Sequence, residues 1–386
     1  MASTIEGPRE AQVIEREPQV IERRVPEVAG AAGEESRPAK PERLVSLDAF
    51  RGFIMMTLAA GGFGFATLAD TPGWGWLAAQ FRHVSWEGMV YWDLIQPAFM
   101  FMVGLAMPYS VAHRQGQPAS VMFWHVLWRA FVLIVLSQVL ISIGRGSLSF
   151  QLINVLAQIG LAYLMCYAIM QLPFRRQAMA AGGVLAFHWA LFALFPGPEG
   201  AFSKEGNIGA VIDGFLGLHY SGYYVTINFI SSGVTMLFGV WAGYLMRAQH
   251  PHAYRMKVLA GAIAGCFIAG WALTLFNPMV KRIWTASFTF ASGGCVLAIL
   301  LGFYWLVEVK GYRKLAFPLV VVGTNSIFVY CVHQVQQGWL DRAVGVFTGK
   351  YEFPGAGGPI AQNLTVFLVI WYLCYWLYQR RIFLRI

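Results

Sequence analysis

Runs of about 20 predominantly apolar residues recur along almost the whole chain beyond residue 42. A bilayer offers no hydrogen-bond partners to an open backbone, so such runs are typical of helices that cross it. The composition agrees, since 57% of the 386 residues are hydrophobic and 12% are charged. The sequence therefore predicts an all-α fold, a polytopic transmembrane helical bundle of about ten spans. We place them at about 47–68, 91–111, 123–143, 152–172, 178–195, 226–246, 257–276, 284–306, 316–336 and 363–379.

A further short helix is expected after the ninth span. Between residues 336 and 347, apolar side chains recur at helical spacing, with Asp341 and Arg342 between them. A helix of this kind is typical of the membrane interface.

Basic residues near the span ends are distributed unevenly between the two sides. The side that carries Arg176 and Lys314 has roughly twice as many Lys and Arg as the side that carries Arg82 and Lys204. Cations near span ends are retained in the cytoplasm, so we expect a multi-pass protein of the cell membrane with both termini cytoplasmic. His83 would then lie on the outer side. The net charge of +9 reflects this bias, and no nucleic-acid partner is expected.

Residues 1–42 differ in kind from the rest of the chain. They are rich in Glu, Arg, Pro and Ala, almost without aromatics, and lack the apolar core of a signal peptide. We expect a disordered cytoplasmic tail here and a transmembrane domain over residues 43–386. All five cysteines fall inside spans with no close pair, so neither a disulfide framework nor a metal site is expected.

Asp48 and Arg51 break the apolar pattern at the start of the first span. Ser46 precedes them as an N-cap, and the helix dipole favours an anion in the first turn. Asp48 and Arg51 are three residues apart and share a helix face. They form either an ion pair that anchors the helix or part of a site for an anionic cofactor at the cytoplasmic side.

His83 is the first candidate for chemistry in a chain this apolar. The segment from Arg82 to Gly88 includes Trp86 and Glu87 and places an imidazole, an indole and a carboxylate just before the second span. Asp93 follows about one turn into that span. Either Asp93 pairs with a neighbouring helix, or it orients His83, as carboxylates do for catalytic imidazoles.

Three later segments place polar groups within spans or at the outer surface. Asn154 and Gln158 lie one helical turn apart, which suits an interhelical amide bond or a ligand contact. Small and polar residues at 323–326 interrupt the ninth span, and such a run lines a cavity or a close helix contact. The residues singled out in these segments are Gln158, Lys281, Trp284, Ser287, Asn325 and His333.

Five motifs occur in register from about Arg43 to the last span, and together they resemble the heparan-α-glucosaminide N-acetyltransferase family of multispan membrane acyltransferases. The motifs are Arg43 to Gly52; His83-x-x-Trp86-x-Gly88 with Asp93-Leu94; Leu156-x-Gln158; Pro278-x-x-Lys281-x-x-Trp284-Thr285-x-Ser287-Phe288; and Val309-Lys310-Gly311 with Gly323-x-Asn325-Ser326-Ile327-x-Val329-Tyr330-x-x-His333.

The resemblance implies transfer of an acetyl group from cytoplasmic acetyl-CoA to the amine of a terminal glucosamine across the membrane. It implies that His83 is the catalytic histidine, that acetyl-CoA is the co-substrate and that no metal is needed. Two positions depart from the family pattern: Gly62 or its neighbour stands where the first family helix has asparagine, and Glu87 replaces the asparagine after Trp86. The large lumenal domain of the animal enzymes has no counterpart before Arg43, so we expect an acceptor other than heparan.

The expected mechanism depends on His83. An amine that attacks a thioester must lose a proton, and an imidazole is suited to accept it. We expect His83 to act as a base in direct transfer or as a nucleophile that carries the acetyl group. Asp93 or Glu87 would fix its tautomer, and Asn325 would donate to the oxyanion. The other expected binding residues are Asp48, Arg51, Trp86, Glu87, Gln158, Lys281, Trp284, Ser287 and His333, with Arg51, Arg129 and Lys314 near the donor phosphates.

Other functions stay open from the sequence. An O-acyltransferase acting on an envelope glycan would use the same base, so the sequence does not separate an amine from a hydroxyl acceptor. A transporter or flippase for a glycan or lipid would show inverted repeats and broken helices, and no clear repeat relates the two halves. A structural scaffold would not explain the polar cluster around His83. The expected partners are a glycan or amino-sugar acceptor and membrane lipid, and a homodimer is left open.

Overall fold

Helices make up the regular structure of the described part of this protein. The computed structural model describes residues 44–384, apart from 115, 219, 221 and 349–356. Within these ranges the chain forms helices and no β-strand, which confirms the all-α class. The predicted disordered tail, residues 1–42, lies outside them.

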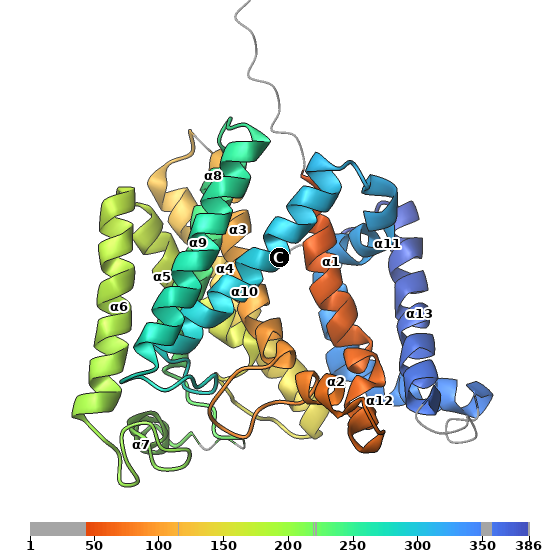
Figure 1. Cartoon of the computed structure of the whole chain (residues 1–386), viewed down its shortest axis with the longest axis horizontal. Helices are drawn as coiled ribbons and strands as arrows, with labels where there is room; N and C mark the ends of the chain where they lie inside the picture. Colours follow the sequence, from red (N-terminus) through yellow and green to blue (C-terminus); the bar gives the residue numbers. More distant parts are fainter. Residues whose placement is uncertain (1–43, 115, 219, 221, 349–356, 385–386) are drawn as a thin grey trace, which may run out of the picture. The chain divides into compact units, whose positions relative to one another are not determined.

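The long helices alternate in direction along the chain, and shorter helices lie in the loops (Figure 1). In chain order they are α1 Val45–Ala59, η1 Gly61–Asp70, α2 Gly75–Gln80, η2 Tyr91–Leu94, α3 Ile95–His113, α4 Ala119–Arg145, α5 Val155–Met170, α6 Phe174–Leu194, α7 Ile208–Phe215, α8 Asn228–Arg247, α9 His252–Leu273, α10 Ala286–Tyr304, η3 Trp305–Val309, α11 Arg313–Thr324, α12 Ser326–Thr348 and α13 Gly357–Gln379.

The described part of the chain contains 7 helices long and apolar enough to cross a membrane, or up to 9 spans if each of two bent helix pairs counts as one. This is a multi-pass membrane protein. The apolar helix α5 has only 16 residues and is shorter than each of these 7 helices. The predicted count of about ten spans is not confirmed, because it treats α5 as a full span as well as both bent pairs.

The first predicted span is broken. α1 ends at Ala59, and the 3-10 helix η1 follows at an angle of 51°. Gly62, Phe63 and Gly64 have φ values of 61°, 57° and 72°, in the left-handed region that glycine adopts readily. The span predicted at 47–68 is therefore a bent pair of helices and not one continuous helix.

The amino end of α1 is capped by another part of the chain. α1 begins directly after Leu44, so the prediction of Ser46 as the N-cap is wrong. Instead the Ser46 amide donates to the Glu308 carboxylate over 2.8 Å. A carboxylate in this place satisfies a free N–H group and favours the helix dipole.

The ninth predicted span is also broken. α11 ends at Thr324 and α12 begins at Ser326, with a bend of 64° between them. α12 then continues to Thr348. The separate interfacial helix predicted at 336–347 is wrong, because these residues form the second half of α12.

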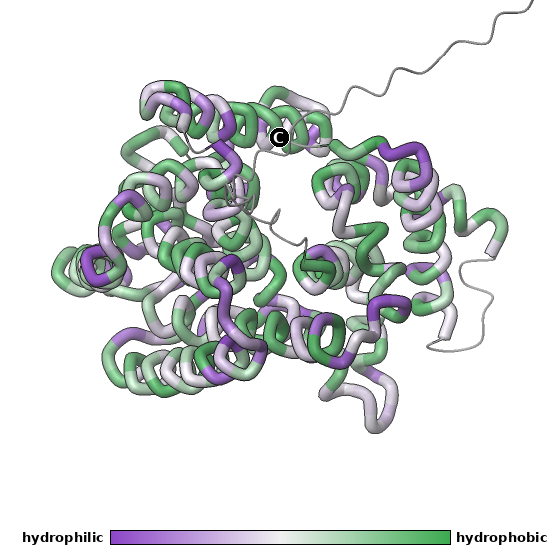
Figure 2. Tube along the Cα trace, turned by 90° about the horizontal axis from the view of Figure 1, so that it is seen from above, coloured by the Kyte–Doolittle hydropathy of each residue, from purple (hydrophilic) through white to green (hydrophobic). Residues whose placement is uncertain are grey.

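Glycines allow the closest helix contacts. α3 packs along α8, and α1 packs along α11. A Cβ atom on Gly104 or Gly239 would overlap the facing backbone in the first pair, and one on Gly52 or Gly323 would do so in the second. Such close contacts at small residues are typical of helix packing in lipid. Seen from above, much of the trace of the outermost helices is apolar, as expected of a lipid-facing surface (Figure 2).

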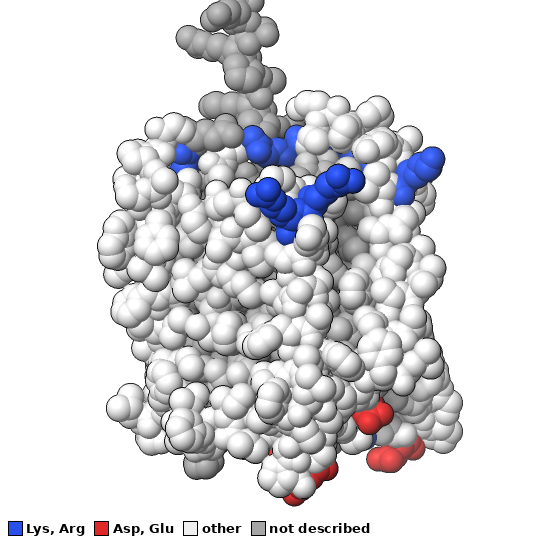
Figure 3. All heavy atoms as spheres, turned by 90° about the vertical axis from the view of Figure 1, so that its left-hand side faces the viewer, with Lys and Arg blue, Asp and Glu red and all other residues white. Residues whose placement is uncertain are grey.

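The two ends of the helix bundle differ in loop length and charge. We call one of them the basic end; there the helices are joined by the short connections 114–118, 171–173, 248–251 and 310–312 (Figure 1). On the face drawn in Figure 3, Lys and Arg gather at this end, and Asp and Glu gather at the other. We call the opposite end the loop end; it carries the longer connections 71–90, 195–227 and 274–285.

Candidate functional site

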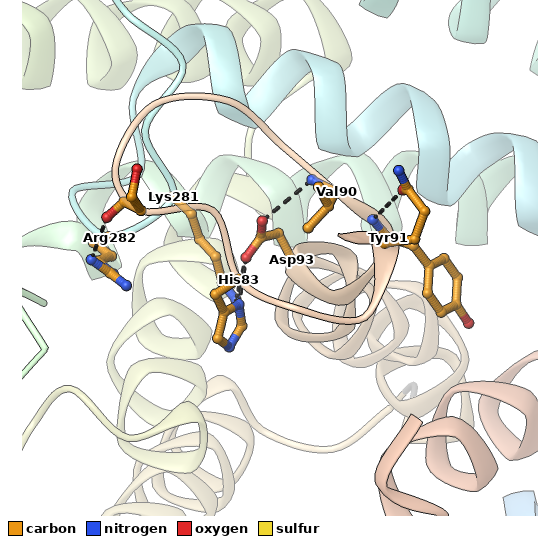
Figure 4. Close-up of polar contacts among 8 residues, drawn as sticks. His83, Val90, Tyr91, Asp93, Lys281 and Arg282 are labelled. Carbon is orange, nitrogen blue, oxygen red and sulfur yellow. Dashed lines mark hydrogen bonds and ion pairs between the residues drawn. The ribbon is translucent and has the colours of Figure 1, made fainter. Parts of the chain in front are cut away.

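Loops of the loop end are tied together around His83. The Gly88 amide donates to the Met279 carbonyl over 2.8 Å. The Arg282 guanidinium donates to the Ser85 carbonyl, also over 2.8 Å (Figure 4). These bonds join connection 71–90, which carries His83, to the loop before α10.

Asp93 holds His83 and Lys281 on one carboxylate oxygen (Figure 4). Nδ1 of His83 lies 2.6 Å from Oδ1 of Asp93, and Nζ of Lys281 lies 3.3 Å from the same oxygen. The Asp93 and Lys281 side chains are 1% and 7% exposed, whereas the His83 side chain is 42% exposed. We call these three residues the His83 cluster. Its charged side chains, Asp93 and Lys281, are buried and paired, whereas the imidazole of His83 is accessible.

The second oxygen of Asp93 is also bound. The Val90 amide donates to Oδ2 over 3.3 Å, at the first turn of η2. With both oxygens engaged, the carboxylate fixes the orientation of His83. A carboxylate accepts only from Nδ1–H, so a neutral His83 ring carries its lone pair on Nε2, on the side away from Asp93. The lone pair is then available to a proton or an electrophile.

A cavity of about 750 Å³ reaches the basic end of the bundle. This volume lies within the range of about 300–1,000 Å³ typical of small-molecule sites. Its walls come from α1, α3, α4, α5, the α11–α12 break and the C-terminal segment. Arg51, Arg114, Arg129, His113 and His125 line it together with apolar side chains such as Met55, Met102, Val103 and Leu133.

The cavity extends toward the loop end but stops short of the His83 cluster. Phe99 and Tyr330 line the cavity, and their rings pack edge to face with their centres 6.2 Å apart. The Tyr330 hydroxyl donates over 3.2 Å to Asn154, which caps α5 on the side of the loop end. The helical path from Asp93 in η2 to Phe99 in α3 covers six residue steps, which correspond to a rise of roughly 9 Å. α3 therefore connects the His83 cluster to the cavity wall.

Gln96 lies on α3 between the two sites, three residues from Asp93 and three from Phe99. It is 6% exposed, and among the described residues its Nε2 has no hydrogen-bond partner. Buried donors without a partner are rare, so such a group is a candidate for contact with a ligand. Sequence reasoning missed Gln96, although a glutamine within an apolar span is a visible signal.

The structure places the Asp48 and Arg51 pair at the cavity. Their side chains contact over 3.4 Å, and both line the cavity near the basic end. Arg129, also expected near the donor, lines the cavity and lies 4.9 Å from the centre of the Tyr163 ring. Lys314 does not line the cavity. Asp48 and Arg51 therefore form an ion pair with each other and also line a cavity in which an anion could bind, so the two alternatives do not exclude each other.

Trp86 and Glu87 lie beside the His83 cluster with different roles. The Trp86 indole donates to the Phe202 carbonyl over 2.9 Å and so anchors connection 71–90 to connection 195–227. Glu87 is exposed and pairs through its backbone with Val280. The carboxylate that orients His83 is that of Asp93.

Gln158, Trp284 and Ser287 are fully buried, and each donates hydrogen bonds within the protein; Oε1 of Gln158 has no partner among the described residues. The Gln158 amide donates to two backbone carbonyls over 2.8 and 3.2 Å. The Trp284 indole donates to Thr235 over 3.2 Å, and the Ser287 hydroxyl donates to the Pro278 carbonyl over 2.9 Å. None of the three lines the cavity, so the structure places them as supports of α5 and α10.

Asn325 is bonded to the C-terminal segment and not to the His83 cluster. Asn325 is fully buried at the break between α11 and α12. Its Nδ2 donates to the Ile382 carbonyl over 3.1 Å, and its Oδ1 accepts from the Leu384 amide over 3.1 Å. These bonds hold the C-terminal segment, so the arrangement does not supply the oxyanion donor expected at His83. His333 is partly buried on α12 and does not line the cavity.

Comparison with known proteins gives two curated relatives, while no family model matches the chain. The heparan-alpha-glucosaminide N-acetyltransferase of Homo sapiens is 24% identical over 421 aligned residues, which cover 90% of this chain and 60% of the human protein. The protein of the same name from Mus musculus is 23% identical over 424 residues, with 91% and 62% covered. The chain thus spans about 60% of the length of the curated relatives it matches.

Proposed function

We propose that this protein is a membrane acetyltransferase that moves an acetyl group from cytoplasmic acetyl-CoA to the amine of an amino sugar on the outer side of the membrane. The observation that carries the proposal is the 2.6 Å contact between His83 and the buried carboxylate of Asp93. Similarity over about nine-tenths of the chain to proteins named N-acetyltransferases supports the same chemistry.

The basic end is proposed to face the cytoplasm. Lys and Arg near span ends are retained on the cytoplasmic side, and they gather at this end on the face drawn in Figure 3. Arg51 would then meet a cytoplasmic donor, and His83 would meet an acceptor outside. Both chain termini would be cytoplasmic, in the inner or plasma membrane.

The cavity residues fit an acyl-CoA donor. Arg51, Arg114 and Arg129 supply charge-assisted hydrogen bonds to phosphates at the basic end. Apolar walls that include Met102 and Leu133 suit the extended pantetheine arm. Bound there, the donor supplies an activated acetyl thioester.

His83 is proposed to move the proton. Its Nε2 takes the proton of the amine as the bond from nitrogen to the acetyl carbon forms, and it returns a proton to the departing sulfur as the C–S bond breaks. Asp93 holds the ring and stabilises the imidazolium. Gln96 is proposed in place of Asn325 as the oxyanion donor, because its Nε2 is buried near Asp93 and has no partner within the described part of the chain.

A covalent route uses the same residues. Nε2 of His83 would first form a bond to the acetyl carbon as the C–S bond breaks, and the amine would then take the acetyl group. The two routes differ in whether label from acetyl-CoA reaches the protein when acceptor is absent. Rapid denaturation at neutral pH preserves label only if the covalent route operates.

The test is incubation of purified protein with labelled acetyl-CoA and a panel of glycans. N-acetylation gives an alkali-stable amide, and O-acetylation gives an alkali-labile ester, so the product distinguishes the two acyltransferases. The inactive control is His83→Ala. Failure of the wild type to label any glycan that carries a free amine would count against the proposal.

A transport function is the second candidate, favoured by the two bent helix pairs. Helices broken within the membrane are typical of transporter binding sites. In proteoliposomes, a transporter would accumulate labelled amino sugar without acetyl-CoA. The proposed enzyme would release acetylated product only when acetyl-CoA is supplied on the cytoplasmic side.

A further inference from the structure

The segment 382–384, beyond the last helix, forms part of the cavity wall. Phe383 and Leu384 line the cavity that Asp48 and Arg51 also line. The wall on this side therefore consists of a short stretch of chain that depends on other residues for its position.

A reversal after α13 brings this segment to the cavity. Arg381 has a φ of 56°, in the left-handed region. The Ile382 amide then donates to the Leu377 carbonyl over 2.9 Å, and the Phe383 ring contacts the Tyr378 ring edge-on at 6.3 Å. The strained turn persists because the surrounding contacts hold it.

Asn325 holds the reversed segment at two points. Its amide donates to the Ile382 carbonyl and accepts from the Leu384 amide, each over 3.1 Å. Gly323, two residues earlier, packs so closely on the backbone of Asp48 that a Cβ would overlap it. The two hydrogen bonds between Asn325 and segment 382–384, which we call the clasp, therefore lie next to the turn of α1 that carries Arg51.

We infer that segment 382–384 is the wall on which the adenine of the CoA donor packs, and that Asn325 is a positioning residue for this wall. The inference rests on the proposed function. Phosphates held by Arg51 and Arg114 would leave the adjoining adenine near the basic end, where it needs an apolar or aromatic face. Phe383 offers an aromatic ring there, as does Tyr109 near the end of α3, whereas the rings of Phe99 and Tyr330 lie toward the loop end. Phe383 is the one of the two that segment 382–384 carries.

The experiment compares equilibrium binding of CoA and of S-acetylpantetheine, which lacks the adenosine diphosphate part, to the purified full chain. Phe383→Ala should weaken CoA binding about tenfold, as expected for loss of one base stack, and should leave S-acetylpantetheine binding within about twofold. Trp376→Ala is the matched control, because it removes an exposed aromatic side chain of α13 that does not line the cavity.

Hydrogen exchange of the C-terminal peptide tests the clasp independently of donor binding. Asn325→Ala should speed exchange of the Leu384 amide and weaken CoA binding, and Phe383→Ala should weaken CoA binding without faster exchange. If Asn325→Ala does not fold, Phe383→Ala still decides the adenine contact.

The other outcomes overturn the inference in different ways. If Phe383→Ala binds CoA as the wild type does, or binds both ligands equally more weakly, the adenine does not pack on Phe383. Either result leaves the proposed function unaffected. A selective loss of CoA binding in Tyr109→Ala but not in Phe383→Ala would place the adenine on α3 instead. A wild-type chain that binds neither ligand overturns both this inference and the proposed function.

Discussion

The His83 cluster and the cavity are built in opposite ways. The His83 cluster depends on loops, since Lys281 and Asp93 meet across 188 residues of sequence. The cavity is lined mainly by the sides of helices, and Phe383 and Leu384, beyond the last helix, also line it. In the cluster the charges are buried and paired, whereas Arg51 at the cavity is 28% exposed.

The difference fits two tasks. A catalytic group needs a fixed orientation, and a buried carboxylate with both oxygens bound supplies it. A site for a large, charged co-substrate must exchange its ligand, which partly solvated cations at an open end permit. Substitutions in the cluster should therefore lower turnover, and substitutions at the cavity should change affinity.

The largest effect is expected from His83→Ala. Loss of the proton acceptor should lower turnover by about a thousandfold or more, with CoA affinity within about twofold of wild type. Steady-state kinetics with binding calorimetry separates the two quantities. The control is His250→Ala, which changes an exposed histidine near the basic end. If His83→Ala kept turnover near the wild-type value, the loop end would not be the site of catalysis.

Asp93→Asn should lower turnover by about a hundredfold, because the ring loses the anion that fixes its tautomer and stabilises its protonated form. It should also destabilise the protein by about 3 kcal/mol, because Lys281 is left buried without its counter-ion. The double variant with Lys281→Met should regain thermal stability in detergent but not turnover. Recovery of both would mean that Asp93 only supports the fold.

Gln96→Leu separates a catalytic amide from a structural one. Loss of an oxyanion donor should lower turnover by about a hundredfold. Stability should be unchanged or higher, because the variant removes a buried donor that has no partner within the described residues. A matched loss of stability and turnover would show instead that Gln96 holds the fold. Gln158→Leu, which removes a bonded amide, is the comparison expected to unfold more easily.

Local sequence was sufficient for two of the three residues of the His83 cluster. His83 and Asp93 lie ten residues apart at a loop and a helix start, so their proximity could be anticipated from spacing alone. The contact with Lys281 depends on a loop far along the chain, so the sequence singled out this residue without placing it beside Asp93. Trp284 and Ser287 came from the same motif and prove to be buried, because a motif does not separate ligand contacts from supports.

The broken helices were predictable in part. The run Gly61-Gly62-Phe63-Gly64 carries a clear helix-ending signal, but hydropathy alone treats it as part of a span. The polar residues at 323–326 were recognised in the sequence, but the bend between α11 and α12 at this place was not predicted. The cavity could not be derived, because its lining combines residues from several helices and from segment 382–384. For the same reason Asn325 was assigned to the wrong neighbours in the expected mechanism.

The smallest effect is expected from a substitution at the cavity. Arg51→Ala should raise KM for acetyl-CoA about tenfold with turnover nearly unchanged, because one charge-assisted contact to a phosphate is lost before the chemical step. Asp48 would lose its partner at 3.4 Å, so the melting temperature must be measured in parallel. Arg175→Ala, an exposed cation at the start of α6 that does not line the cavity, is the control for net charge. If Arg51→Ala lowers turnover and leaves KM unchanged, the division between a catalytic loop end and a binding cavity fails, since Arg51 would then act on the chemical step from the opposite end of the bundle.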